Sequence, residues 1–360
     1  MAAEHLTEHY YDTLDHDLER YGLMIARIPS EAGVIWRLTL PRGEVVEAWE
    51  PGTAGLNPPA EIVELTGSIL DGKELVPESI VLREPGARRL RESMVAQLEA
   101  LLAHDPGVRL GADPENLHQH RVAARRARAF LRATRDYVEP EWSEDLAELL
   151  SELGETTGPV RDLDVLIDHA GPGLDASAPP DRLGADHLRD LLVGERDTLR
   201  GRLLDSLDGD RYRLLLTRLR FPPRFRADVE DVPVERIARK EFARLARRVK
   251  RAGSSPDDAS IHALRITLKR TRYAAELSSP RGGAGRRFIE AAKLLQDLLG
   301  EHQDAVVAES RLRALTVQDE ATAAAFVAGR LAERQVDRRA AVTARLPEAW
   351  RRLRRRAAKL

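Results

Sequence analysis

Two segments of the sequence repeat one pattern of histidine and basic residues. The segment His118-x-x-Arg121-Val-x-x-Arg125-Arg-x-Arg128 recurs as His262-x-x-Arg265-Ile-x-x-Lys269-Arg-x-Arg272, at a constant offset of 144 residues. Guanidinium groups bind phosphate oxygens through paired hydrogen bonds, and a lysine ammonium serves as a point charge. The chemistry that these residue types suggest is therefore the binding of an anion, carried out twice by a duplicated unit.

On an α-helix, the residues of the first segment divide into two faces. At about 100° per residue, five basic side chains fall within an arc of about 80°: His118, Arg121, Arg125, Arg128 and Arg132. Apolar residues such as Ala127 and Phe130 lie on the opposite side and form a core face. The second segment gives the same basic row with His262, Arg265, Lys269 and Arg272, but Glu276 stands where Arg132 would be repeated.

Two interpretations of these basic rows remain open. Stacked cations repel one another, and the first segment has no interleaved acid to relieve that repulsion. Acids from neighbouring helices, such as Asp162, Asp164 and Asp304, could neutralise the rows internally. A bound polyanion could also neutralise them, and a row with helical pitch suits a chain of phosphates better than one small anion.

The histidines admit three roles. His118 and His262 could donate to an anion, could be structural, or could bind a metal if they met across a pseudo-twofold axis. A metal site needs further ligands, and no carboxylate or third histidine stands at helical spacing beside either one. The anion-donor role is the more economical, so no metal and no cofactor are expected. His120 points about 200° away from His118 and is expected to be structural.

The elements that must position these residues are mainly helical. The chain is 42% hydrophobic but only 4% aromatic, so its core must consist mostly of Leu, Ala and Val. Short strands are expected at 22–28 and 34–40, followed by a helix near 60–69. From about residue 86, the periodicity predicts helices at 88–104, from Asp113–Pro114 onward, and then at 142–153, 162–169, 186–207, 211–219, 234–252, 258–277, 287–299, 304–314 and 320–346, with a basic tail at 351–359.

Charge divides the chain in the same place. Residues 1–87 carry 6 Lys/Arg and 16 Asp/Glu, a net charge of -10, whereas residues 88–360 carry 51 and 43, a net charge of +8. An anionic ligand is therefore expected on the second part. The chain has no cysteine, no apolar run long enough to span a bilayer and no signal-peptide pattern at its N-terminus. These features predict a cytoplasmic protein without a membrane partner.

The repeated segments closely resemble the CHAD domain, the conserved histidine α-helical domain. A second motif pair supports the resemblance, because Gly158-Pro-Val-Arg-Asp162 is echoed by Gly300-Glu-His-Gln-Asp304 at an offset of 142. The resemblance implies an all-α fold of two pseudo-symmetric four-helix bundles over residues 86–358, with halves at about 88–221 and 233–357. It also implies a basic cleft between the bundles that binds inorganic polyphosphate without catalysis, and a location at polyphosphate granules.

Residues 1–85 resemble the early strands of a CYTH domain, the triphosphate tunnel fold. The resemblance rests on His9-Tyr-Tyr-Asp-Thr13, Leu18–Arg27 and Trp36–Pro41. The opening Glu-x-Glu-x-Lys signature is absent, Thr39 stands where a lysine is usual, and about 85 residues cannot close an eight-stranded tunnel. A shortened, β-rich segment without triphosphatase activity is expected. Triphosphatase or polyphosphatase activity through this segment is one alternative function. Nucleic-acid binding is another, disfavoured by the few aromatic residues and the pI of 6.6.

Overall fold

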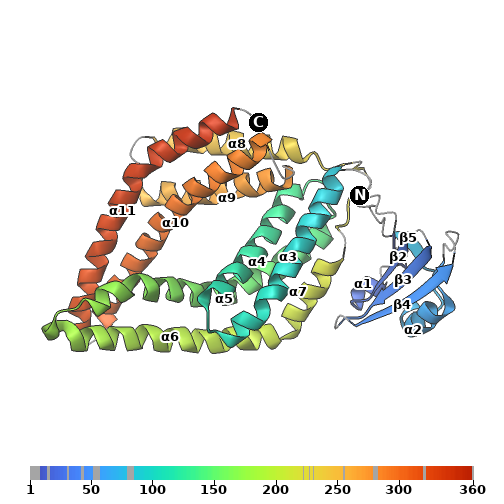
Figure 1. Cartoon of the computed structure of the whole chain (residues 1–360), viewed down its shortest axis with the longest axis horizontal. Helices are drawn as coiled ribbons and strands as arrows, with labels where there is room; N and C mark the ends of the chain where they lie inside the picture. Colours follow the sequence, from blue (N-terminus) through green and yellow to red (C-terminus); the bar gives the residue numbers. More distant parts are fainter. Residues whose placement is uncertain are drawn as a thin grey trace.

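The computed structural model describes residues 9–13, 17–30, 32–41, 44–51, 57–78, 85–221, 223–226, 228–229, 231–253, 256–278, 283–318 and 322–358. An antiparallel sheet at the N-terminus, the sheet domain (9–78), precedes a body of long helices, the helical body (85–358) (Figure 1). Among the described helices, none has both the length and the apolarity needed to cross a bilayer.

The sheet domain contains five strands in the order β4-β3-β2-β1-β5. The strands are β1 (His9–Asp12), β2 (Met24–Pro29), β3 (Gly33–Thr39), β4 (Val45–Pro51) and β5 (Val76–Glu78), and the helices are α1 (Asp17–Arg20) and α2 (Ala60–Leu70). Two strands and α2 lie within two residues of their predicted positions. Side chains alternate between the two faces of the sheet, and Ile25, Trp36 and Leu38 pack with Ile62 of α2 in one core.

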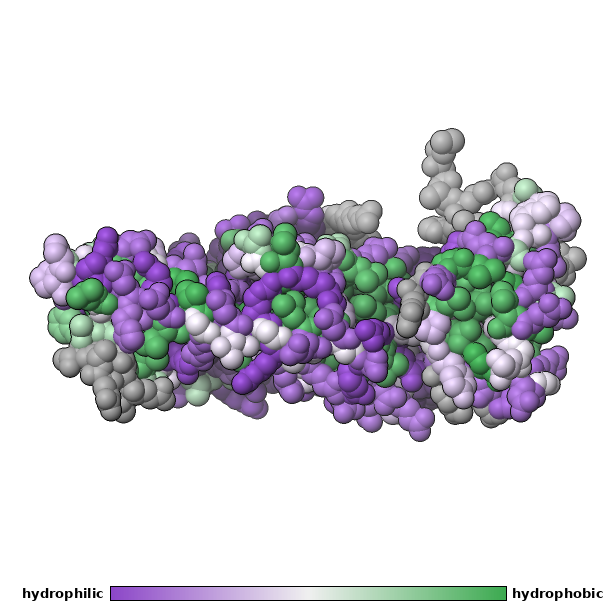
Figure 2. Space-filling model, turned by 90° about the horizontal axis from the view of Figure 1, so that it is seen from below, coloured by the Kyte–Doolittle hydropathy of each residue, from purple (hydrophilic) through white to green (hydrophobic). Residues whose placement is uncertain are grey.

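A buried carboxylate joins the sheet domain to the helical body. Glu19 of α1, only 4% exposed, forms ion pairs with Arg218 and Arg224 of the helical body. The Thr217 hydroxyl also donates to the Pro41 carbonyl over 3.4 Å. In Figure 2 the helical body is covered mainly by hydrophilic residues, whereas hydrophobic residues gather on the sheet domain. Exposed apolar side chains of that domain include Trp49 of β4 and Leu65 of α2.

The helical body contains two sets of long helices. The first set is α3 (Pro85–Leu110), α4 (Pro114–Thr134), α5 (Pro140–Asp175), α6 (Arg182–Asp208) and α7 (Asp210–Arg220), with a 3₁₀ turn at Pro179–Asp181. The second set is α8 (Val234–Ala252), α9 (Asp258–Ser278), α10 (Gly283–Gln318) and α11 (Thr322–Ala357). Helix α4 begins as its sequence predicts, because the Asp113 carboxylate accepts from the Glu115 amide over 2.9 Å and Pro114 follows it.

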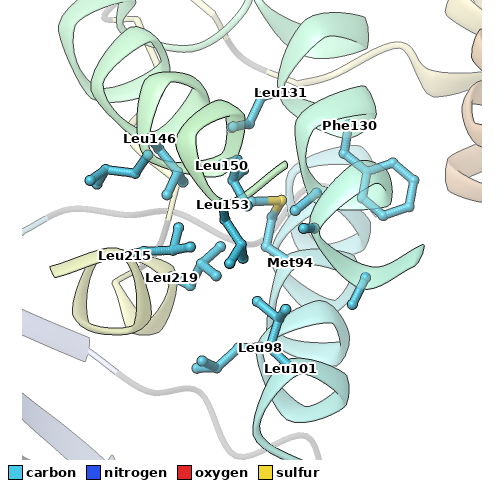
Figure 3. Close-up of a cluster of buried hydrophobic side chains, with 14 of the residues drawn as sticks. Met94, Leu98, Leu101, Phe130, Leu131, Leu146, Leu150, Leu153, Leu215 and Leu219 are labelled. Atoms are coloured by element: carbon cyan, nitrogen blue, oxygen red, sulfur yellow. The ribbon is translucent and has the colours of Figure 1, made fainter. Parts of the chain in front are cut away.

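Three apolar cores hold these helices in a frame (Figure 1). The first lies among α3, α4, α7 and the beginning of α5, and contains Leu101, Phe130 and Leu150 (Figure 3). The second lies among α8, α9, the beginning of α10 and the end of α11. In the third, the end of α5 and the beginning of α6 pack against the end of α10 and the beginning of α11. Burying each such leucine contributes about 2 kcal/mol to stability. Because α5 and α10 both reach the third core, this core joins the two sets of helices.

Close backbone contact supports the third core. A Cβ atom at Gly184 of α6 would lie 2.4 Å from the Ala323 carbonyl oxygen of α11, which is closer than any side chain allows. The absence of a side chain at Gly184 therefore lets α6 and α11 approach each other where the two halves meet.

Three sequence predictions about helix boundaries were wrong. The predicted helices at 142–153 and 162–169 are one helix, α5, which runs through Pro159. Those at 287–299 and 304–314 are one helix, α10, and most of the basic tail after Arg351 continues α11. Proline removes one backbone donor, and glycine disfavours a helix by about 1 kcal/mol. Packing along both sides of these helices outweighs such local costs.

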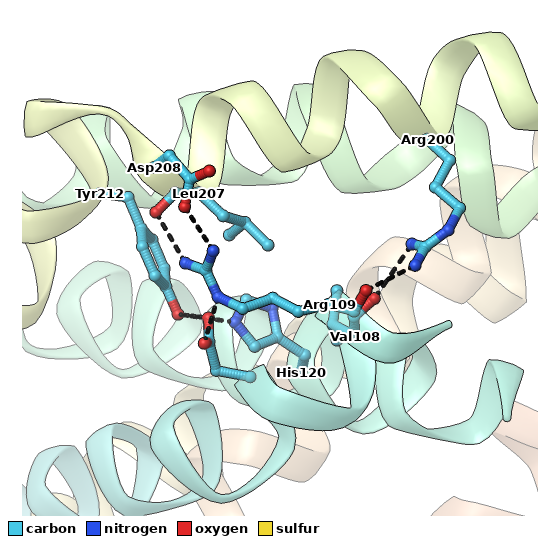
Figure 4. Close-up of polar contacts among 8 residues, drawn as sticks. Val108, Arg109, His120, Arg200, Leu207, Asp208 and Tyr212 are labelled. Atoms are coloured by element: carbon cyan, nitrogen blue, oxygen red, sulfur yellow. Dashed lines mark hydrogen bonds and ion pairs between the residues drawn. The ribbon is translucent and has the colours of Figure 1, made fainter. Parts of the chain in front are cut away.

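A buried polar cluster joins α3, α4 and α7 (Figure 4). His120 is fully buried, and its Nε2 lies 3.0 Å from the Tyr212 hydroxyl, which donates to Asp105 over 3.0 Å. Asp105 also accepts from Arg109 Nε over 2.6 Å. Burial lowers the pKa of His120 to about 4, so the ring is neutral at neutral pH. His120 thus lies on the core side of α4, as its helical position predicts.

This buried histidine makes the fold sensitive to acid. Between its unfolded pKa of about 6.5 and its folded pKa of about 4, the unfolded chain binds more protons, so the free energy of unfolding decreases as pH falls. We expect His120 to account for a loss of about 3 kcal/mol across this interval. Urea unfolding at several pH values measures it, and His120→Gln should have a shallower pH profile. An equally steep profile in the variant would contradict the assignment.

Candidate anion-binding site

The repeated helices α4 and α9 meet in the middle of the frame. Most apolar residues of α9 enter a different core from those of α4, but the end of α9 joins the α4 core, where the Phe130 and Tyr273 rings pack edge to face at 6.3 Å. Arg125 Nε donates to the Tyr273 hydroxyl over 3.3 Å. This contact fixes the relative position of the two basic rows and turns both toward shared cavities.

Four cations from the two rows form a common wall. Arg121 and Arg125 come from α4, and Arg265 and Lys269 come from α9. All four line two adjoining cavities of about 510 and 500 Å³. Asp162 of α5 and Asp304 of α10 line both cavities as well. The sequence prediction that the two rows face one space therefore agrees with the geometry for these four residues.

The two cavities are related by the internal repeat. One contains His262 beside Gln303 of α10 and the Pro159 region of α5. The other contains His118 beside Arg161 of α5 and the Gly300 region of α10. Gln303 and Arg161 are themselves repeat equivalents at the offset of 142. The two histidines therefore lie in different cavities on either side of the shared cations and do not converge on one point.

The histidines have different surroundings. His262 is exposed, and its Nδ1 lies 2.5 Å from the Gln303 Oε1. His118 is partly buried, and burial together with the nearby Arg161 charge lowers its pKa. Among the described residues, no group of three His, Cys, Asp or Glu side chains could hold a metal ion. Each histidine is therefore placed to offer a ring nitrogen to a ligand in its own cavity.

The carboxylates of the site neutralise only part of its positive charge. Arg121 donates to Asp162 over 3.3 Å and to the Gly158 carbonyl over 3.1 Å. Within the described part of the chain, Arg265 and Lys269 have no hydrogen bond and no ion pair, and the Arg265 Nε is buried without a partner. Asp162 and Asp304 are the carboxylates that line both cavities with the four cations. Each cavity also has acids of its own: Glu195 in one, and Asp297 and Glu301 in the other.

Burial lowers the pKa of three of these basic side chains. Burial, and then the charges of Arg125, Arg265 and Arg121, lower the pKa of Lys269 to about 6. Burial is also the main cause of the lowered pKa of Arg121 and Arg265, and it raises the pKa of Asp304. A cavity in which cations are poorly hydrated and incompletely paired favours an anion that supplies both charge and hydrogen-bond acceptors.

Three predicted site residues lie outside the two central cavities. Arg272 is only 6% exposed, donates to Glu276 and Gln296 over 2.5 and 2.8 Å, and packs against the Tyr273 ring. Arg128 is exposed and lines neither cavity. Arg132 lines a different cavity, between α4, α8 and α9. Arg272 is therefore neutralised by an acid of the protein itself, as the alternative interpretation of the rows predicts.

The sequence did not identify three further arginines that line the central cavities. Arg161 lies in the Gly-Pro-Val-Arg-Asp motif, so its motif could have revealed it. Arg311 and Arg338 lie on α10 and α11 among many other arginines, and nothing in their spacing distinguishes them. Both are paired, Arg311 with Glu195 and Arg338 with Glu301 at 3.2 Å. They add less unpaired charge than Arg265 and Lys269.

Comparison with protein families identifies this architecture. The family model of the CHAD domain matches residues 92–313, which is more than half of the chain. The chain belongs to the CHAD family. The matched residues contain all four cations of the central wall and both histidines, and they begin and end inside the 86–358 interval expected from the sequence.

Relatives and solved CHAD structures agree with this assignment. Uncharacterised proteins Rv2226 and MT2285 of two Mycobacterium tuberculosis strains are each 33% identical over 242 residues, which cover 64% of this chain and 46% of theirs. The aligned part thus spans about half the length of these relatives. The crystal structure of the CHAD domain from the plant Ricinus communis has a TM-score of 0.57, is 28% identical and covers 73% of this chain and 90% of its own.

A second solved structure shares the fold. PptA from Streptomyces chartreusis has a TM-score of 0.58 at 19% identity, covering 74% of this chain and 99% of its own. The fold class predicted from the sequence, two pseudo-symmetric helical bundles with a small N-terminal β-rich part, is confirmed.

The crowded cations should lower the stability of the free protein. Replacing a buried, unpaired charge with an apolar side chain of similar length removes both its desolvation and its repulsion by neighbours. We expect Lys269→Met to raise the free energy of unfolding by about 1–3 kcal/mol at pH 6, where much of Lys269 is charged, and by less at pH 9. Chemical unfolding at the two pH values measures the difference. Lower stability of the variant at pH 6 would contradict this reading of the site.

Proposed function

We propose that the central cavities bind inorganic polyphosphate without catalysing its hydrolysis. The observation that carries the proposal is the pair Arg265 and Lys269. Both lie half-buried in the shared wall without a hydrogen bond or ion pair among the described residues, and the Arg265 Nε is fully buried. A phosphate chain supplies an acceptor oxygen at every unit, so one ligand can satisfy Arg121, Arg125, Arg265 and Lys269 together. The adjoining cavities offer room on both sides of these cations.

A chain of phosphates fits the arrangement better than a single small anion. The four cations belong to two helices, and His118 and His262 lie on opposite sides of them. A single phosphate reaches only part of this set, whereas a chain passing through both cavities reaches all of it. The polyphosphate binding implied by the CHAD resemblance is consistent with this geometry. Recruitment of the protein to polyphosphate granules follows as part of the proposal.

The sheet domain does not favour an enzymatic alternative. Its buried acids already have partners: Asp12 accepts from the Leu18 and Glu19 amides, Asp17 pairs with Lys73 at 2.7 Å, and Glu19 pairs with the helical body. Phosphoryl transfer relies on metal ions held by such acids. We infer that residues 1–85 are a shortened CYTH-like segment without triphosphatase activity. Phosphate release from tripolyphosphate with Mg²⁺ or Mn²⁺, lost on deletion of that segment, would revive the enzymatic alternative.

The double substitution Arg121→Ala with Arg265→Ala tests the binding site. Each charge-assisted hydrogen bond contributes about 1.5–3 kcal/mol, so we expect at least a 100-fold loss of affinity for long-chain polyphosphate at fixed ionic strength. Titration calorimetry measures the loss, and unfolding curves establish that the variant is folded. Arg351→Ala with Arg352→Ala, exposed on α11, removes the same charge and should change affinity little.

Unchanged affinity in the Arg121/Arg265 variant would refute the site assignment. Two further titrations of the parent protein separate the ligand classes. Polyphosphate should bind more tightly than pyrophosphate, and the affinity should fall with added salt. Displacement of polyphosphate by single-stranded RNA at equal phosphate concentration would favour nucleic-acid binding instead.

Lys269 couples binding to protons. The ligand's negative charge should raise the pKa of Lys269 above its free value of about 6, so binding at pH 8 should take up close to one proton. Affinity should therefore fall as pH rises from about 6. Calorimetry in two buffers with different ionisation enthalpies measures the uptake. Lys269→Arg keeps the charge at all pH values and should abolish the uptake, and equal uptake in parent and variant would contradict the coupling.

A further inference from the structure

A second basic cavity of about 490 Å³ lies between α4, α8 and α9. It shares no residue with the two central cavities. It is lined by six cationic side chains, five from the three helices and one, Arg135, from just after α4: Arg132, Arg135, Arg236, Lys240, Arg244 and Arg270. Only two acids, Asp136 and Glu241, also line it. The charge is thus concentrated at a place that the central site does not use.

The charge of this cavity arises where the two copies of the internal repeat differ. At the repeat offset of 144, Arg126 is equivalent to Arg270, and Arg132 is equivalent to Glu276. In one half Arg126 pairs with Glu276, with 3.5 Å between Nε and Oε2. In the other half the equivalent position holds an arginine, so Arg270 lies near Arg132. Burial and then the Arg132 charge lower the pKa of Arg270. Arg270 therefore lacks the carboxylate partner that its repeat equivalent, Arg126, has in Glu276.

The two acids of this cavity are already engaged. Asp136 lies 3.5 Å from Arg135, and Glu241 pairs with Arg244. In the described part of the chain, the remaining four cations have no ion pair and no hydrogen bond from their side chains: Arg132, Arg236, Lys240 and Arg270. Arg132, Arg236 and Lys240 are exposed and Arg270 is half-buried, so among the described residues this positive charge is balanced by solvent rather than by carboxylates.

Helix α8 repeats the unfavourable spacing seen in α4. Arg236, Lys240 and Arg244 follow one another at intervals of four residues on the side that faces the cavity. Like charges at this spacing destabilise a helix by a few tenths of a kcal/mol per pair, about the amount that a Glu–Lys pair would contribute favourably. Only Glu241 interrupts this face, and it pairs with Arg244, so Arg236 and Lys240 face Arg132 and Arg270 without a carboxylate partner among the described residues.

We propose that the cavity between α4, α8 and α9 is a second binding site for phosphate-type anions, organised by Arg132 and Arg270. Its ligand has two sources with the same chemistry: a short free phosphate anion, or a distal part of the polyphosphate chain held in the central cavities. The second source rests on the function proposed above. Arg132 lies seven residues beyond Arg125 on α4, about 10 Å along the helix, and the exposed Arg128 lies between them.

The substitution Arg132→Glu tests the proposal. It places a carboxylate where the repeat equivalent already has one, so Arg270 gains an internal partner and the variant should fold normally. In calorimetry with pyrophosphate, we expect two binding equivalents in the parent and one in R132E. With long-chain polyphosphate, we expect about a tenfold loss of affinity and a salt dependence shallower by about one unit. Arg236→Glu, from α8, should reproduce both changes.

The matched control is Arg239→Glu, an exposed residue of α8 that does not line the cavity. Loss of one pyrophosphate equivalent supports a short free anion, and weaker binding of the long chain supports a distal segment. If R132E and R236E change neither quantity more than R239E does, the second site does not exist. Failure of the central site would appear instead in the Arg121/Arg265 variant, so the two proposals can fail separately.

Discussion

The partial burial and crowding of four basic side chains, which together lower the pKa of Lys269 to about 6, are the constraint around which this protein is built. Arg121, Arg125, Arg265 and Lys269 are held together by two helices, although only two carboxylates, Asp162 and Asp304, line both cavities with them. Left to themselves, such groups would separate and hydrate. Two apolar cores prevent that separation because they anchor the opposite faces of α4 and α9, and the third core holds the far ends of α5 and α10 together. Hydrophobic packing thus maintains an electrostatically strained site in the free protein.

The long helices explain how two duplicated bundles enclose one space. Helices α5 and α10 each begin in one bundle and end in the third core, so both run past the cations and contribute Asp162 and Asp304. Duplication supplies matching cavities on the two sides of the wall. Divergence then altered them, since Arg161 is matched by Gln303 and Arg132 by Glu276. The same repeat therefore gives a shared central site and, where one half has an arginine in place of the other half's carboxylate, an additional basic cavity.

The sequence predicted the parts of this structure that depend on local pattern. The duplicated motif, the facing rows and the start of α4 at Asp113 follow from residue type and helical periodicity. The continuity of α5 through Pro159 did not follow, because tertiary packing overrides a local helix breaker. The burial of Arg272 with Glu276 and Gln296 also depends on partners that only the folded chain brings together. Similarly, β5 forms because it pairs with β1, more than 60 residues earlier in the chain.

A structure of the protein in complex with a polyphosphate chain tests the central claim most directly. The account predicts phosphate oxygens within hydrogen-bond distance of Arg265 and Lys269, with the chain extending from the His118 cavity into the His262 cavity. It would be contradicted by a chain bound to exterior basic residues, such as those at the end of α11, while the central cations keep the arrangement of the free protein.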